Sequence, residues 1–339
     1  MNGTESEIEI FKPFGEAFEL MKKILFQPFD FKKWLVVGFA AFLAGLSGGF
    51  NFSFNPFSRW SSQRDHKAIA ESFRELGSIG QMDWWVIALL VLGSLMILAL
   101  VLALMWLGAR GRFIFTDCIV RNRGAIVAPW KEFRAQGNSL FLFSLLVVLL
   151  LIVLVVIGLF ALMLPLVPRG ANAQPALGFW ISLSLFVFLV LCLAFGWALL
   201  SQLMVPIMYR QRCSATHAFA QAMRLVVTHP GPIILYVLFL LLLIVAAAMI
   251  SCTVACVTCC IAAIPYVGTV ILLPIPVTLR GFSLLFLRQF GPDYDVWANF
   301  VLPEFMPILS PGVPVQAAPI EPPSPPPSSN PPPHPPPVP

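Results

Sequence analysis

Long apolar stretches without charged side chains constrain this chain more than any other feature of its sequence. Several of them reach about 20 residues, the length that an α-helix needs to cross the hydrocarbon core of a bilayer. Charged residues make up only 11% of the chain, whereas about a quarter is usual for a soluble domain. The composition excludes a soluble enzyme, a nucleic-acid-binding module, a disordered protein and a collagen-like fibre. It predicts an all-α integral membrane protein.

Six apolar segments are candidates for membrane-spanning helices. They cover residues 34–54, 84–107, 139–164, 179–209, a segment beginning near residue 232, and 264–287. The fifth has no clear end, because the apolar run continues past Ile250 without a charge, and Pro274 and Pro276 interrupt the sixth. The first begins only at Trp34, after residues with charged side chains throughout, so we expect it to stay in the mature protein as a signal anchor.

The basic residues predict how these segments are oriented. If the six segments cross the membrane in turn, 16 of the 21 Lys and Arg residues lie on one side and five on the other. Short loops that stay in the cytoplasm carry an excess of Lys and Arg. We therefore predict a multi-pass protein of the bacterial inner (plasma) membrane with both termini in the cytoplasm.

The predicted organisation has three parts. Residues 1–33 form a cytoplasmic segment with an amphipathic interfacial helix, residues 34–290 form the six-span domain with an outer loop at 51–83, and residues 291–339 form a cytoplasmic, proline-rich, disordered tail. The outer loop is either a ligand site or a lid lying on the membrane. The tail, in which 15 of the last 29 residues are Pro, is either a docking peptide for a protein partner or a stiff spacer.

A similar segment precedes each odd-numbered span. In the first, Phe14, Phe18, Met21 and Leu25 follow the spacing of one helix face, with charged residues on the other. Related segments precede the third and fifth spans, and helices of this kind lie in the headgroup plane. Two basic motifs also recur: Arg110-Gly111 with Arg280-Gly281, and Arg121-x-Arg123 with Arg210-x-Arg212. These features predict three copies of one unit, although basic inner ends and amphipathic lead-in segments are also common in unrelated membrane proteins.

The segment Phe14-Gly15-Glu16-Ala17-Phe18, followed by Met21-Lys22-Lys23 and then directly by an apolar span, resembles a loose group of bacterial polytopic proteins. That group is related to the membrane domain found beside glycerophosphodiester phosphodiesterases. The resemblance covers about residues 11–290 in pattern and implies an integral membrane architecture without implying an activity. We expect no phosphodiesterase domain in this chain, because a proline-rich segment follows the last span.

Basic residues near the predicted cytoplasmic ends of the helices form a candidate surface for anionic lipid headgroups. Each would contribute about 1 kcal/mol toward an anionic membrane. We call this set the basic collar: Lys22, Lys23, Arg110, Arg112, Arg121, Arg123, Arg210, Arg212, Arg280 and Arg288.

The sixth span is the candidate position for a binding site, because a helix broken by Pro exposes backbone groups that transporters use to hold substrates. Prolines that only kink the helix are the alternative. The residues that could line a polar cavity there are Asp117, Gln202, Pro274, Pro276 and Arg280. We expect Asp117 to pair with the arginines near it and Gln202 to hydrogen-bond a neighbouring helix.

Cys252, Cys256, Cys259 and Cys260 share one face of a helix. Close helix packing, a disulfide or redox role, and a metal site all fit this pattern. No His or carboxylate lies nearby and no paired CxxC motif is present, so we predict no cofactor.

These features favour a non-catalytic scaffold, partner subunit or lipid-interacting module, since no catalytic motif is found. A passive transporter or permease with its site near the sixth span is the alternative, and a membrane-embedded enzyme is the third hypothesis. The partners implied are the lipid bilayer with its anionic headgroups and a protein for the proline-rich tail, and no nucleic acid. The oligomeric state is not indicated.

Overall fold

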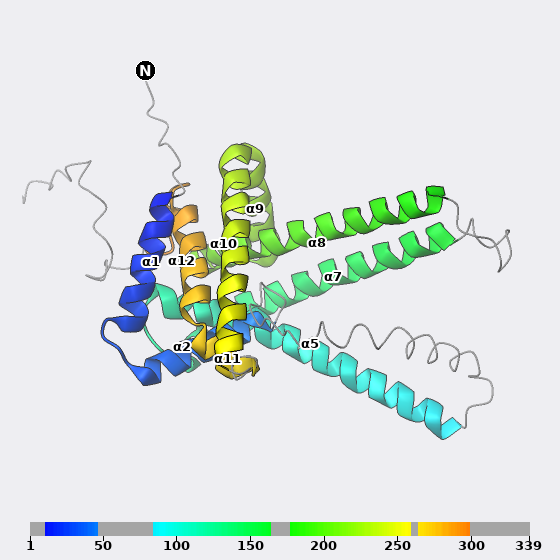
Figure 1. Ribbon diagram of the computed structural model, residues 1–339, viewed down its shortest axis with the longest axis horizontal. Coiled ribbons are helices and arrows are strands. Elements are labelled where there is room, and N and C mark those ends of the chain that lie inside the picture. Colours follow the sequence, from blue (N-terminus) through cyan, green and yellow to red (C-terminus); the bar gives the residue numbers. More distant parts are fainter. Residues whose placement is uncertain (1–10, 47–83, 164–176, 259–263, 299–339) are drawn as a thin grey trace, which may run out of the picture. The chain divides into compact units, whose positions relative to one another are not determined.

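The computed structural model describes residues 11–46, 84–163, 177–258 and 264–298, and all regular elements within them are helices (Figure 1). The helices are α1 (Phe11–Phe26), α2 (Phe31–Gly45), α5 (Trp84–Val120), α6 (Val127–Glu132), α7 (Arg134–Met163), α8 (Leu177–Gln211), α9 (Ala215–Thr228), α10 (Pro230–Val257), α11 (Pro265–Ile271) and α12 (Pro274–Arg288).

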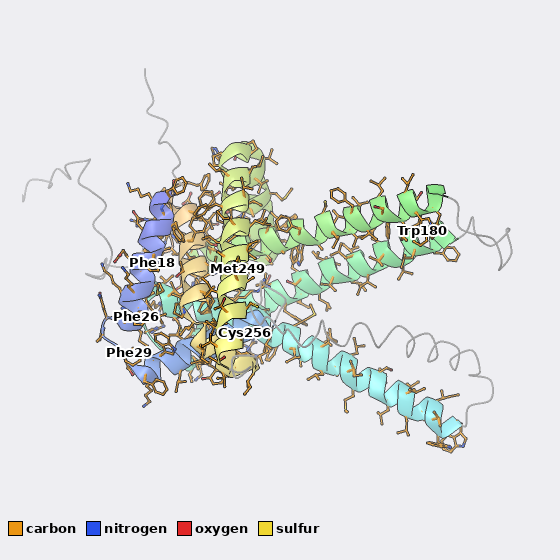
Figure 2. The ribbon with its side chains drawn as sticks, viewed as in Figure 1. Phe18, Phe26, Phe29, Trp180, Met249 and Cys256 are labelled. Atoms are coloured by element: carbon orange, nitrogen blue, oxygen red, sulfur yellow. The ribbon has the colours of Figure 1, made fainter. Side chains whose placement is uncertain are left out.

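Four of these helices, α5, α7, α8 and α10, are long and apolar enough to cross a membrane. They coincide with the second to fifth predicted spans, and α10 ends at Val257, a boundary that could not be predicted from the apolar pattern. Much of their surface consists of large apolar side chains, such as Met96 on α5 and Leu238 on α10, both more than 60% exposed. Figure 2 labels two further examples, Trp180 on α8 and Met249 on α10. Such a surface is stable against lipid rather than water, as in an integral membrane protein.

The first and sixth predicted spans have a different form. Helix α2 ends at Gly45, and the rest of the first predicted span, residues 47–54, lies outside the described residues. The sixth consists of two short helices, α11 and α12, so the predicted break before Pro274 is confirmed. Pro274 opens α12, where a missing N–H group costs no hydrogen bond within the helix.

Local sequence explains where several helices begin and end. Asp30 caps α2, because its side chain accepts hydrogen bonds from the backbone N–H groups of Lys32 and Lys33. Helices α5 and α8 are each followed by a residue with positive φ. These residues are Asn122, with a φ of 49°, and Arg212, with a φ of 55°. A left-handed residue is a common way to end a helix and turn the chain.

Helices α5, α8 and α12 form the centre of the fold, because each contacts the other two. Their C-terminal parts are buried, and the largest side chains without exposed surface include Phe113 and Ile114 of α5, Met204 and Ile207 of α8, and Phe282 and Phe286 of α12. The hydrophobic core therefore lies where these three helices meet.

Each central helix pairs with a helix that precedes it in the chain. Helix α2 contacts α5, α7 contacts α8, and α10 contacts α12. In each pair, a contact joins the start of the first helix to the end of the second. These contacts are Lys33 Nζ donating to Asn122 Oδ1 at 2.6 Å, Gln136 Nε2 donating to the Arg212 carbonyl at 3.5 Å, and the His229 and Phe290 rings at 5.4 Å. The three pairs are therefore antiparallel hairpins.

The shorter helices α1, α6 and α9 each pack on a central helix. For α6 and α9 this is the central helix just before them in the chain, and for α1 it is the last central helix, α12. Helix α6 contacts α5, α9 contacts α8, and α1 contacts α12, which runs beside it in Figure 1. The last contact joins the two ends of the described chain, with Ala17 and Leu20 lying next to Gly281. The contact pattern therefore closes on itself.

Two predictions are corrected by this packing. Met21 and Leu25, predicted to face the membrane together with Phe14 and Phe18, are instead buried in the protein with Ala17, Leu20 and Ile24, whereas Phe18 is 44% exposed. The reason is that α1 packs on α12 through small and aliphatic side chains.

The second correction concerns the predicted tail, which was expected to begin at residue 291. Residues 291–298 instead continue the fold, because Val296 and Trp297 are buried in the core. Arg288 Nε also donates to Asp295 Oδ2 at 3.1 Å, which fixes the turn after α12.

Helices α2 and α5 cross closely at Gly111. A Cβ atom at this position would lie 2.5 Å from the carbonyl carbon of Leu43 and 2.6 Å from the nitrogen of Ala44. Both neighbours are backbone atoms, which cannot move without shifting α2. Small residues allow helices in a membrane to approach in this way.

We predict that Gly111→Ala lowers the free energy of unfolding by about 1–3 kcal/mol, because the added methyl group overpacks this crossing. Thermal unfolding of the purified protein in detergent measures the effect. Gly93→Ala is the matched control on the same helix, because no atom lies within 4 Å of its Cβ position. Equal melting temperatures for the two variants would show that the crossing is not tight.

Candidate functional site: polar contacts between the central helices

Arg280 of α12 links all three central helices. Its Nε and one terminal nitrogen donate to Thr116 Oγ1 of α5 at 3.2 and 2.9 Å. The other terminal nitrogen donates to Gln202 Oε1 of α8 at 3.1 Å and to the Gln202 carbonyl at 3.3 Å. One guanidinium group therefore holds one residue from each of the other two helices.

The setting of Arg280 is apolar, because α12 is buried around its whole circumference from Arg280 to Leu287. A buried charge is costly unless it is well hydrogen-bonded. Here neutral oxygen atoms accept hydrogen bonds from all three guanidinium nitrogens, and Thr116 in turn donates its hydroxyl hydrogen to the Arg112 carbonyl at 2.8 Å. The contact is directional, so it fixes the rotation of α12 relative to α5 and α8.

A second cluster of polar side chains surrounds Asp117, the residue after Thr116. Asp117 has no exposed surface. The Tyr209 hydroxyl donates to Asp117 Oδ1 at 3.0 Å, and Arg121 Nε lies 3.0 Å from the same oxygen. Arg123 donates to Oδ2 through two nitrogens, at 3.2 and 3.0 Å. The prediction that Asp117 pairs with its neighbouring arginines is confirmed, and Tyr209 adds a link from α5 to α8.

The Asp117 group continues through Arg121, which donates to Glu132 Oε1 of α6 at 2.8 Å. Arg212, just beyond α8, forms an ion pair with the same Glu132 oxygen. Partial burial alone raises the pKa of the Glu132 carboxyl, but the contacts with Arg212 and Arg121 outweigh it and hold this pKa below its ordinary value. Glu132 is therefore ionised at neutral pH and joins the ends of α5 and α8.

Aromatic rings pack beneath these ion pairs. The Phe133 ring is stacked on Tyr209 at 4.7 Å and on Phe113 at 5.8 Å between ring centroids. The Arg212 guanidinium carbon lies 4.0 Å from the Phe133 ring centroid, a cation–π contact. The stack explains why Phe133, at the end of the short helix α6, is fully buried.

Arg110 occupies a separate site between two tryptophan rings. Its guanidinium carbon lies 4.2 Å from the Trp106 ring centroid and 4.9 Å from that of Trp130, and it donates to Asn138 Oδ1 at 2.9 Å. Only 6% of Arg110 is exposed. This arrangement joins α5, α6 and α7.

The basic collar is therefore only partly exposed. Arg110 and Arg280 are buried, which corrects the prediction that they face lipid headgroups. Protein side chains occupy the space around their guanidinium groups. The other members are half-buried or exposed: Lys22, Lys23, Arg112, Arg121, Arg123, Arg210, Arg212 and Arg288. We keep the name exposed collar for these eight residues.

The residues predicted to line a polar cavity are only partly brought together. Gln202 and Arg280 bond directly, which confirms that Gln202 reaches a neighbouring helix. Asp117 belongs to the separate group around Tyr209. Pro274 and Pro276 lie in the first turn of α12, one to two turns before Arg280.

The cysteine cluster is described only in part. Cys252 and Cys256 are exposed and carry free thiols on α10, where Figure 2 labels Cys256, and Cys259 and Cys260 lie outside the described residues. Within the described ranges, no group of three or more His, Cys, Asp or Glu residues is placed to hold a metal ion.

Sequence reasoning missed Thr116, Tyr209 and Glu132, which supply the partners of the charged residues. Thr116 and Tyr209 each stand directly before a charged residue, Asp117 and Arg210, and this was the available signal. Their role depends on contacts across 164 and 92 positions of the chain, respectively, which no local pattern reveals.

We predict that Thr116→Val lowers the free energy of unfolding by about 1–3 kcal/mol, because two nitrogens of the buried Arg280 lose their acceptor. Unfolding in detergent measures this loss. Thr253→Val is the matched control, since Thr253 is exposed on α10 and its hydroxyl bonds only to the Met249 carbonyl. An equally small effect of both substitutions would contradict the central role given to Arg280.

Comparison with known proteins gives a family without an assigned activity. No curated protein and no solved structure matches the chain. Residues 9–289 match a family described as "Family of unknown function (DUF7544)". The match covers most of the chain and includes every helix described above, and we conclude that the protein belongs to this family.

Proposed function

We propose that this protein is a non-catalytic integral membrane protein that acts as a scaffold, partner subunit or lipid-interacting module. The observation that carries the proposal is the convergence of arginines at one end of the central helices. Arg121 and Arg212 share Glu132 beyond α5 and α8, and Arg210 Nε donates to the Pro292 carbonyl beyond α12 at 3.4 Å. A basic surface at one end of a membrane bundle is suited to anionic headgroups.

The contact pattern supports three copies of one structural unit. Each unit would contain a short helix, an outgoing helix and a returning helix: α1 with α2 and α5, α6 with α7 and α8, and α9 with α10 and α11–α12. The returning helices contact one another, and each short helix packs on a returning helix of the preceding unit, with α1 on α12. The shared order of elements and the left-handed residues after α5 and α8 favour this repeat.

The same pattern supports six spans rather than four. Helix α2 pairs with α5, and α12 pairs with α10, just as α7 pairs with α8. We therefore assign α2 to the first span and α11–α12 to the sixth. The excess of basic residues at the open ends of the hairpins favours a cytoplasmic position for this end and for both termini, in the inner membrane.

We predict that green fluorescent protein is fluorescent when fused to either terminus, and that alkaline phosphatase is active when inserted near residue 70 or 170. The reason is that these fusions report the cytoplasmic and the opposite side of the membrane, respectively. An active phosphatase insertion between residues 121 and 127 would contradict the proposed orientation. So would termini found on opposite faces.

The polar contacts favour this role over a passive transporter. At the break between α11 and α12, Trp34 Nε1 donates to the Val270 carbonyl at 3.0 Å. Arg280 donates hydrogen bonds to Gln202 Oε1 and to Thr116 Oγ1. The groups that a substrate would need are thus engaged by protein partners. The resemblance to membrane domains that accompany glycerophosphodiester phosphodiesterases is compatible with an accessory role and stays a prediction.

We predict that replacing Lys22, Lys23 and Arg210 with Gln lowers the phosphatidylglycerol that copurifies with the protein, by about fivefold for each charge that contacts lipid. Mass spectrometry of lipids retained from mixed phosphatidylglycerol and phosphatidylcholine membranes measures this. The control is Glu19→Gln with Asp293→Asn, which removes charges of opposite sign and should cause no loss. Unchanged lipid in the triple variant would reject the role of the exposed collar.

A further inference from the structure

Five exposed phenylalanines follow one another along residues 11–31. They are Phe11, Phe18, Phe26, Phe29 and Phe31, with exposed fractions between 44% and 80%. Figure 2 labels three of them, Phe18 and Phe26 on α1 and Phe29 in the turn after it. We call this set the phenylalanine surface. Phe18 also belongs to the apolar face that the sequence predicted, whereas Met21 and Leu25 of that face are buried.

The helical spacing explains why these side chains have no place in the core. Phe11, Phe18 and Phe26 are seven and eight residues apart, close to two helical turns of about 7.2 residues, so they share one face of α1. Ala17, Leu20 and Ile24 form the opposite face, which is buried. These three phenylalanines therefore lie on the side of α1 opposite to its buried face, and Phe11 also contacts the Phe239 ring of α10 at 5.7 Å.

Basic side chains accompany these rings. Lys22 Nζ lies 4.8 Å from the centroid of the Phe18 ring, and Lys12 and Lys32 are exposed. Of the nearby acidic groups, Glu19 pairs with Lys22 at 2.9 Å, and Asp30 caps α2. A surface that combines aromatic rings with Lys side chains matches the boundary between acyl chains and anionic headgroups.

The surface is continuous with a helix that leads into the predicted first span. Phe29 and Phe31 flank the residue that caps α2, and the rings of Phe26 and Phe29 lie 5.3 and 5.7 Å from the Trp34 ring. Lys33, one residue earlier, reaches Asn122 just beyond α5. The start of α2 thus lies beside the turn that follows α5.

We propose that the phenylalanine surface inserts into the headgroup layer of the bilayer that holds the spans, with anionic lipid as its partner. This inference rests on the membrane placement in the proposed function. It goes further by assigning the lipid contact to the exposed side of α1 and the turn after it, where Lys22 holds an anionic headgroup beside the Phe18 ring.

Photocrosslinking of the full chain in phosphatidylglycerol and phosphatidylcholine vesicles tests the proposal. The photoreactive analogue p-benzoylphenylalanine replaces Phe18, Phe26 or Phe29 in turn, and mass spectrometry identifies what is attached after irradiation. Phe188, which is exposed on the long helix α8, is the positive control, and the irradiated wild-type chain gives the background. We expect lipid adducts at all three positions in amounts comparable with those at Phe188.

The outcomes separate the inference from the proposed function. Lipid adducts at Phe188 and none above background at the three test positions would overturn the inference while the membrane placement stands. Adducts with another protein in place of lipid would overturn it as well. If Phe188 also gives no lipid adduct, the membrane placement itself is wrong and the inference falls with it.

The headgroup preference has its own readout at position 18. We expect Lys22→Gln to lower the ratio of phosphatidylglycerol to phosphatidylcholine adducts there by about fivefold. Glu19→Gln, one turn away from Lys22, is the matched control and should leave the ratio unchanged or raise it. An unchanged ratio in the Lys22 variant would overturn the assignment of anionic lipid as the partner.

Discussion

The hydrogen bonds from Arg280 to Thr116 and Gln202 hold the three central helices in one arrangement. In water, burial of apolar surface would drive helices together, but lipid chains are as apolar as the side chains that they surround. Helix association in a membrane therefore depends on close packing and on polar contacts between helices. Arg280 supplies a directional contact to both α5 and α8, and Gly111 lets α2 approach α5 closely.

The charged groups divide into those that bind the protein together and those that remain exposed. Arg280, Arg110 and Asp117 are buried and engaged by neighbouring helices, whereas the side chains of Lys22 and Arg212 are 44% and 41% exposed. The first set fixes the relative positions of the helices near one end of the bundle. The second set makes that end basic, which is the physical basis of the lipid-interacting role that we propose.

The positions of the helices could be predicted from the sequence better than which side of each helix is buried. The apolar runs located α5, α7, α8 and α10 because about 20 uncharged residues have one stable form in a bilayer. The break at Pro274 and the arginine partners of Asp117 were also predicted, since both depend on nearby residues. The contact between α1 and α12 was not predicted, and Met21 and Leu25, which were expected to face the membrane, are buried together with Ala17 and Leu20.

The sequence by itself determined that the chain is helical and apolar enough for a membrane, and which segments form its long helices, because hydrophobicity and proline position act locally. Tertiary structure decided which basic residues are buried. In the sequence, nothing distinguishes Arg110 and Arg280 from Arg121 and Arg123. In the fold, side chains from other helices surround the first two: Trp130 and Asn138 contact Arg110, and Thr116 and Gln202 contact Arg280. Such enclosure depends on contacts between distant segments, and these form only when three hairpins pack around a common centre.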